Sequence, residues 1–191
     1  MNQGDESQEW VTKREESLNQ LLYKSHTWSE LMRCRRGEVH EGLCRLLKSL
    51  VYAIGSAEIL ETIVDQDVYT FCEIEERLQH KLQVIVFTQK RVCIGTLEKP
   101  DVPNSAWSRT LKRSSIKSLS LSVSEPAPSR QDHFSSKQHL SIIAEYNGLD
   151  EPLAIGCKST NTSHYEDYTD GPSFLERMEH INQLIMENLN C

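Results

Sequence analysis

The chain has 191 residues, of which 38% are hydrophobic and 26% are charged, and its formal net charge is −7 at pH 7. This composition excludes a disordered chain, and the acidic balance disfavours sequence-independent binding to nucleic acid, which depends on neutralising phosphates. The polar, acidic start and the absence of any run of roughly 18 apolar residues argue against a secretory signal and a membrane span, so we expect a cytoplasmic protein.

The first predicted element is an amphipathic helix from about Glu6 to Lys24. Its apolar residues recur at helical spacings among charged neighbours, and they are Trp10, Leu18, Leu21 and Leu22. Two interpretations of this stripe stay open. It either packs within its own helical bundle or forms a face for self-association, which would make the protein a homo-oligomer through its N-terminal helices.

Further helices are predicted before residue 65. One is expected to begin at Thr27, and the strongest apolar stripe in this region runs from Val39 to Ile54 and ends at Gly55. We also expect a short helix after Ser56, carrying Leu60, Ile63 and Val64. Residues 1–65 are therefore assigned to a helical N-terminal region.

After Asp65 the apolar period changes from 3.6 towards 2, so residues 66–191 are assigned to a β domain. Seven strands are predicted, at 68–78, 82–87, 91–97, 107–111, 114–124, 139–147 and 151–158. The alternation of serine with apolar residues in 114–124 predicts one buried face and one wet face. Long loops are expected at 124–137 and 159–171, and the chain closes with a helix whose stripe runs from Phe174 to Leu189. The predicted fold class is α+β.

The cysteines and the known catalytic motifs give no clear site. Six cysteines occur without a Cys-x-x-Cys pair, and the chain has no glycine-rich phosphate loop, nucleophile elbow or His-Glu-x-x-His motif. We therefore predict a protein that is not an enzyme and has no cofactor or metal. One alternative is a dispersed thiol site, which would pair one of three cysteines with one of three histidines: Cys72, Cys93 or Cys157 with His80, His139 or His164. An acidic loop at 166–170 lacks the ligand spacing of an EF-hand.

Basic residues gather near turns that would meet at one end of the predicted sheet. They are Lys90, Arg91, Arg109, Lys112, Arg113 and Lys117. On an acidic protein such a patch would attract anionic partners locally, and these six residues form our predicted binding site. The alternative is that basic turns only keep the ends of the sheet soluble.

Two stretches carry a family resemblance, LQVIVFTQKRVCIG at 82–95 and WSRTLKRSSIKSLSLS at 107–122. With the order of strands and the closing helix, they resemble the pleckstrin-homology-like superfamily, especially its bacterial and GRAM-type branches, over residues 67–189. The resemblance implies a bent antiparallel sheet capped by the C-terminal helix, used as a platform without chemistry of its own. Members that bind phosphoinositides have a basic cluster on the first strand pair. Here EERLQHKL offsets Arg77, His80 and Lys81 with two glutamates, which disfavours headgroup binding.

These observations together predict a binding or adaptor protein. Its partner is expected to be a protein or peptide, recognised by the β domain, with the helical region serving assembly. An anionic membrane surface is the first alternative partner, because the basic turns would be attracted to it. The small enzyme with a dispersed thiol site is the second alternative.

Overall fold

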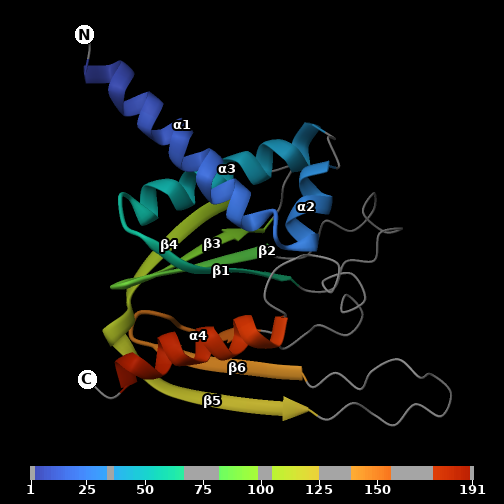
Figure 1. Cartoon of the computed structure of the whole chain (residues 1–191), viewed down its shortest axis with the longest axis vertical. Helices are drawn as coiled ribbons and strands as arrows, with labels where there is room; N and C mark the ends of the chain where they lie inside the picture. Colours follow the sequence, from blue (N-terminus) through green and yellow to red (C-terminus); the bar gives the residue numbers. More distant parts are fainter. Residues whose placement is uncertain are drawn as a thin grey trace, which may run out of the picture. The chain divides into compact units, whose positions relative to one another are not determined.

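The computed structural model describes residues 3–33, 37–66, 82–98, 105–124, 139–155 and 174–189. The chain divides into two compact units, an N-terminal unit (Met1–Leu111) and a C-terminal unit (Lys112–Cys191). The described residues contain helices, seven strands in two antiparallel sheets and a C-terminal helix (Figure 1). The predicted α+β class, the strand count and the closing helix are confirmed.

The N-terminal unit begins with three helices, α1 (Gln3–Leu22), α2 (His26–Arg33) and α3 (Gly37–Ile54). The predicted stripe of α3 is confirmed, because Leu43, Leu46 and Leu50 are fully buried in the core. The helix ends at Gly55 as expected. Gly55 has a φ of 62° and donates its N–H to the Val51 carbonyl at 2.9 Å, which closes the last helical turn.

The short helix predicted after Ser56 is wrong, because the segment forms strand β1 (Ile59–Gln66). A spacing of three between Leu60 and Ile63 suits a helix, but the run Thr62, Ile63, Val64 is β-branched and fits a strand better. β1 pairs antiparallel with β2, Ile63 lying opposite Ile85. The boundary expected at residue 65 therefore falls inside a strand, and the compact unit extends to Leu111.

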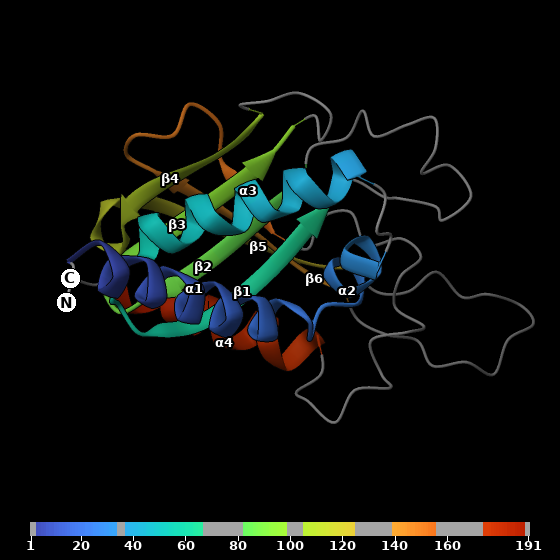
Figure 2. The ribbon, with the colours of Figure 1, turned by 90° about the horizontal axis from the view of Figure 1, so that it is seen from above.

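The first sheet has the order β1-β2-β3-β4 and contains three of the predicted strands, β2 (Leu82–Thr88), β3 (Arg91–Leu97) and β4 (Ala106–Lys112). α1 and α3 lie over one face of this sheet (Figure 2). That face contributes Val84, Val86, Cys93 and Leu97 to the core shared with the helices. Gly95 lies opposite Val84 in the middle of this face, and its missing side chain leaves room for α3.

The C-terminal unit contains the short 3-10 helix η2 (Arg113–Ser115) and a second sheet of the order β5-β6-β7, formed by Ile116–Ser124, His139–Tyr146 and Leu153–Ile155. Gly148, with a φ of 94°, lies in the predicted turn between β6 and β7. The helix α4 (Phe174–Leu189) lies along β5 and β6 and buries Met178, Ile181 and Ile185 (Figure 1).

The apolar face of β5 is less buried than its alternation predicts. Leu121 lies opposite the fully buried Ile142, yet 48% of its surface is exposed. β5 is an end strand of its sheet, so its side chains are covered from fewer directions than those of the central strand β6.

Several predictions lie outside the described residues. They are the strand at 68–78, residues 125–137 and 159–171 of the predicted loops, and the candidate residues Cys72, Cys157, His80 and His164, with the His139 side chain. Among the helices that the structure describes, none is both long and apolar enough to cross a membrane.

Candidate functional site

Among the six predicted basic residues, Arg113 departs furthest from the expected exposed patch. Its side chain is only 5% exposed. The guanidinium donates to the Leu184 carbonyl of α4 and forms an ion pair with Glu187 at 3.1 Å. Arg113 therefore fastens α4 to η2 within the C-terminal unit and is not available to an outside partner.

Arg109 lies on the other face of the first sheet from Arg91. The Thr110 hydroxyl contacts the Cys93 sulfur at 3.8 Å on the side covered by α3, so the neighbouring Arg109 projects from the opposite face. There its guanidinium carbon lies 5.9 Å from the centre of the Trp107 ring, a cation–π contact. Arg91 precedes Cys93 by two residues and so projects on the α3 side. Lys112 and Lys117 belong to the C-terminal unit and are exposed.

Lys90 and Arg91 are the two predicted residues that the structure brings together at a concave site. They occupy the turn between β2 and β3, beside an open pocket with a volume of about 420 Å³. Two segments line it, the end of α3 with the connection to β1 and the β2–β3 turn: Ile54, Gly55, Ser56, Ala57 and Glu58, and Thr88, Gln89, Lys90 and Arg91. We call this site the turn pocket.

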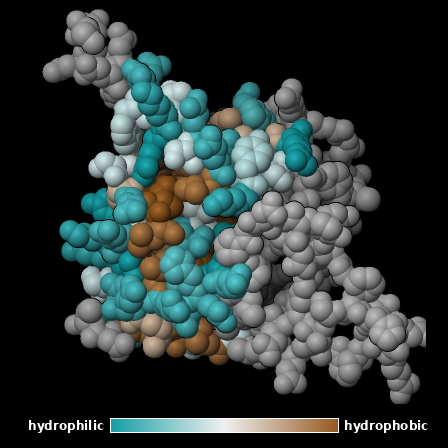
Figure 3. Space-filling model, viewed as in Figure 1, coloured by the Kyte–Doolittle hydropathy of each residue, from teal (hydrophilic) through white to brown (hydrophobic). Residues whose placement is uncertain are grey.

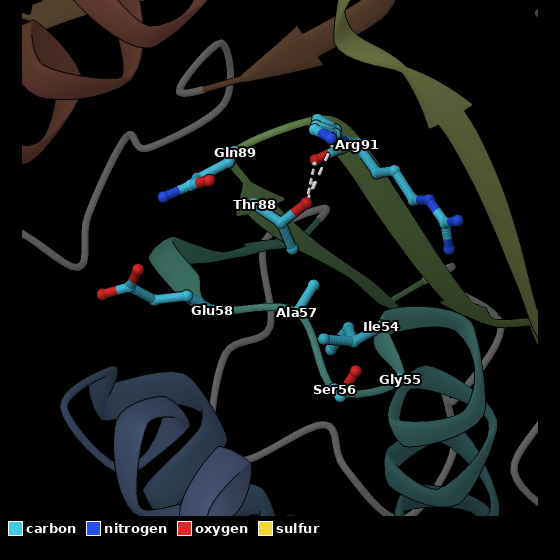
Figure 4. A pocket seen from close by; sticks show the side chains of 9 residues that line it. Ile54, Gly55, Ser56, Ala57, Glu58, Thr88, Gln89 and Arg91 are labelled. Carbon is cyan, nitrogen blue, oxygen red and sulfur yellow. Dashed lines mark hydrogen bonds between the residues drawn. The ribbon is translucent and has the colours of Figure 1, made fainter.

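Both walls of the turn pocket are fixed by hydrogen bonds. The buried Thr88 hydroxyl accepts the Arg91 N–H at 3.0 Å and donates to the Arg91 carbonyl at 3.1 Å (Figure 4). On the facing wall, Gly55 adopts the left-handed conformation that ends α3. The strand pair and the helix therefore hold the backbone of the site in one arrangement, so an occupant would meet a preformed pocket.

Three carbonyls in the last turn of α3, and the Ala57 carbonyl that follows the helix, already have donors, which matters because a helix C-terminus is otherwise a negative site. The donors are the N–H groups of Gly55 and Ala57, the Cys93 thiol and the Arg14 guanidinium, and they bond the carbonyls of Val51, Ile54, Ala53 and Ala57 respectively. The pocket is therefore not built to attract a cation at this helix end.

The charged side chains around the turn pocket are still unpaired. Within the described part of the chain, neither Lys90 nor Arg91 forms an ion pair, and Glu58 forms none either. Figure 4 shows Glu58 and Arg91 reaching in opposite directions from the pocket. The positive charges are exposed at one wall, where an anionic group can reach them.

The thiol alternative finds no support at Cys93. This residue is fully buried; its thiol donates to the Ala53 carbonyl at 3.6 Å, and its sulfur accepts from the Thr110 hydroxyl at 3.8 Å. Burial raises the pKa of the Cys93 thiol, against smaller lowering effects of Thr110 and Arg91, so the nucleophilic thiolate is disfavoured. No group of three or more His, Cys, Asp or Glu residues is placed to hold a metal ion in the described ranges.

Two of the four residues of the predicted self-association stripe are buried inside the N-terminal unit, and Leu21 is half-buried. Leu18 and Leu22 are buried in its core, whereas Trp10 is 40% exposed. In the view of Figure 3, the visible surface over α1 is mainly hydrophilic. The packing alternative therefore accounts for both leucines, and Trp10 is the member that a second copy could still contact.

Comparison with known proteins adds no assignment to this geometry. Neither a protein-family model, nor a curated protein, nor a solved structure matches the chain. The functional argument therefore rests on the turn pocket. Its Ser56–Glu58 wall was missed in the sequence, because these residues were assigned to the start of a helix, although the β-branched run that follows them indicates a strand.

Proposed function

We propose that this chain is a non-enzymatic binding protein, an adaptor that recognises a protein or peptide partner through an anionic group entering the turn pocket. The observation that carries the proposal is a pair of exposed cations beside a preformed pocket, Lys90 and Arg91, which form no ion pair among the residues that the structure describes. The pocket volume lies within the range of about 300–1,000 Å³ common for ligand sites. A carboxylate or phosphate of the partner at the rim of the pocket would form charge-assisted hydrogen bonds with both side chains once Arg91, which extends away from the pocket (Figure 4), turns toward it.

The order of elements supports the proposed likeness to the pleckstrin-homology-like superfamily. Four strands form one antiparallel sheet, three form a second, and a single helix follows them at the end of the chain. That layout suits a platform whose turns carry the recognition.

A protein or peptide is favoured over a membrane surface by the placement of the basic residues. Binding to anionic lipid grows by about 1 kcal/mol for each Lys or Arg near the surface, so it requires several on one face. Arg113 is buried, and Arg109 lies on the opposite face of the sheet from Arg91. Two cations at a pocket suit one anionic group better than a lipid surface.

The proposal is tested by selecting from a random peptide library on the full chain. We expect the selected peptides to be enriched in Asp, Glu or a free C-terminal carboxylate, and to lose affinity about tenfold or more for K90E/R91E, because a favourable contact becomes repulsive. The matched control is K112E/K117E, which reverses two exposed lysines of the C-terminal unit and should leave binding unchanged.

Two outcomes would contradict the proposal. In one, the selected peptides bind the K90E/R91E variant as tightly as the unchanged chain. In the other, the protein sediments with phosphatidylserine vesicles, salt weakens that binding, and no peptide is selected. The second result would favour the membrane alternative, because screening by salt is the mark of an electrostatic surface contact.

A further inference from the structure

A histidine and a cysteine converge on the outer side of α3, away from the turn pocket. His40 and Cys44 lie one helical turn apart, so their side chains share one face of the helix. The Cys44 sulfur and His40 Nε2 are 3.6 Å apart, and Cys44 is exposed. The exposed Cys44 thiol therefore lies beside a ring nitrogen of the partly exposed His40.

The separation of these two atoms suits a shared metal ion. A tetrahedral zinc ion with a Zn–S bond of about 2.3 Å and a Zn–N bond of about 2.0 Å holds sulfur and nitrogen about 3.5 Å apart. In the metal-free protein the same pair makes a thiol–imidazole hydrogen bond. An ion bound to both atoms would lie off the line that joins them, at nearly the same sulfur–nitrogen separation, after the proton between them is lost.

Two carboxylates act on the Cys44 thiol, Glu15 of α1 and Glu41, and Glu41 already pairs with Arg45 at 3.6 Å. Burial and these carboxylates raise the pKa of the thiol, so the thiolate forms only when a bound ion displaces the proton.

We propose that His40 and Cys44 form a binding site for a thiophilic divalent ion of the zinc class. The thiol loses its proton to water as the metal–sulfur bond forms, and His40 contributes the Nε2 lone pair. The remaining positions of the ion are filled by water, because the described residues offer no third ligand. His40 Nδ1 is buried without a hydrogen-bond partner, so the ring lacks the outer support of a structural zinc site. We therefore expect affinity well below that of a four-ligand site.

The test is a titration of the full, reduced chain with Co²⁺, whose bond to a thiolate gives a charge-transfer absorption, followed by displacement with Zn²⁺. We expect the band in the unchanged chain, and a loss of affinity of about tenfold or more in both Cys44→Ser and His40→Gln. Loss of a side chain that only supports a metal ligand already lowers metal affinity about 10- to 100-fold, so the loss of a ligand itself should cost at least as much.

Matched controls separate this pair from the other thiols and histidines. Cys191→Ser and His180→Gln should bind Co²⁺ as the unchanged chain does, and circular dichroism should show that all four variants are folded. The proposal is overturned if the unchanged chain gives no thiolate band, if Cys44→Ser keeps it, or if His40→Gln binds Co²⁺ with unchanged affinity. The last result would show that the Cys44 thiolate binds Co²⁺ without His40 as a ligand.

Discussion

In each unit a helix packs on an antiparallel sheet, yet the helix–sheet contact of the N-terminal unit differs in kind from that of the C-terminal unit. In the N-terminal unit, α3 approaches β3 over Gly95, where an added Cβ would lie 2.8 Å from Leu50 Cγ and 2.9 Å from Leu46 Cδ1. In the C-terminal unit, α4 is fastened by Arg113, which bonds the Leu184 carbonyl and Glu187. The first contact depends on close apolar packing. The second combines the apolar stripe of α4 with hydrogen bonds from a buried guanidinium.

These two kinds of contact also differ in whether they use a basic side chain. In the described residues, Lys90 and Arg91 form no ion pair, whereas Arg113 is already bonded to α4. The two units can be followed separately, because Trp10, Trp28 and Trp107 are the three tryptophans of the chain and all lie in the N-terminal unit. Their fluorescence reports on that unit, and hydrogen exchange of α4 reports on the other.

The largest effect is expected from Leu50→Ala, which removes a fully buried side chain from the close apolar packing of α3 on β3. Loss of the apolar contacts and the cavity left behind should lower the free energy of unfolding by about 2–5 kcal/mol. Urea denaturation followed by tryptophan fluorescence measures the change. Tyr52→Ala, at an exposed position of the same helix, is the control and should change the stability by less than about 0.5 kcal/mol. Equal losses would mean that α3 does not depend on this contact.

The C-terminal unit should instead be sensitive to alkaline pH through Tyr146. Burial raises the pKa of this phenol to about 12, although Arg113 acts in the opposite direction, and the side chain is 2% exposed. In the unfolded chain the phenol ionises near 10, so the stabilisation is complete below pH 10 and is lost as pH rises towards 12.

This loss should amount to about 2–3 kcal/mol, on the scale of 1.36 kcal/mol for each pKa unit. It is measured by circular dichroism in urea at pH 9 and pH 11.5, and the comparison of the unchanged chain with Tyr146→Phe isolates the contribution of this phenol. The phenylalanine variant should lose less stability over the interval. Parallel losses in the two proteins would show that other groups account for the alkaline effect.

Arg113→Met tests the fastening of α4 directly. Two charge-assisted hydrogen bonds are lost, at an expected cost of about 1.5–3 kcal/mol. Hydrogen exchange of the α4 amides should become about 10- to 100-fold faster, while tryptophan fluorescence reports little change in the N-terminal unit. Glu187→Gln should cost only about 0–1 kcal/mol, because Glu187 is 66% exposed. A cost as large as that of Arg113→Met would show that the ion pair, not the bond to Leu184, holds the helix.

The elements with a strong period could be predicted from sequence, and the roles of single residues could not. The apolar spacing of three and four in α3 fits only a helix, and the alternation of serine with apolar residues in β5 fits only a strand. The segment of Leu60, Ile63 and Val64 fits a helix and a strand, and pairing with β2 decides it. Lys112-Arg113 has the composition of a solvated corner, so only the tertiary fold reveals that Arg113 is buried. The turn pocket joins residues about 30 positions apart, a proximity that no local pattern contains.

The smallest effect concerns Gly95 and tests whether shape alone sets the distance between α3 and the sheet. Gly95→Ala should cost about 1 kcal/mol, since the new Cβ overlaps Leu50 and Leu46, while about 0.4–1 kcal/mol is recovered through the unfolded chain. In a Leu50→Ala background the overlapping Cγ and Cδ1 atoms of Leu50 are gone, and the added methyl fills part of the cavity.

The cost of Gly95→Ala should therefore vanish or change sign in that background, giving a coupling of about 1 kcal/mol in a double-mutant cycle followed by tryptophan fluorescence. Additive effects would indicate that Leu46, whose Cδ1 also lies 2.9 Å from the added Cβ, sets the limit. The same cycle with Leu46→Ala distinguishes the two leucines, because the coupling must follow the side chain that blocks the methyl group.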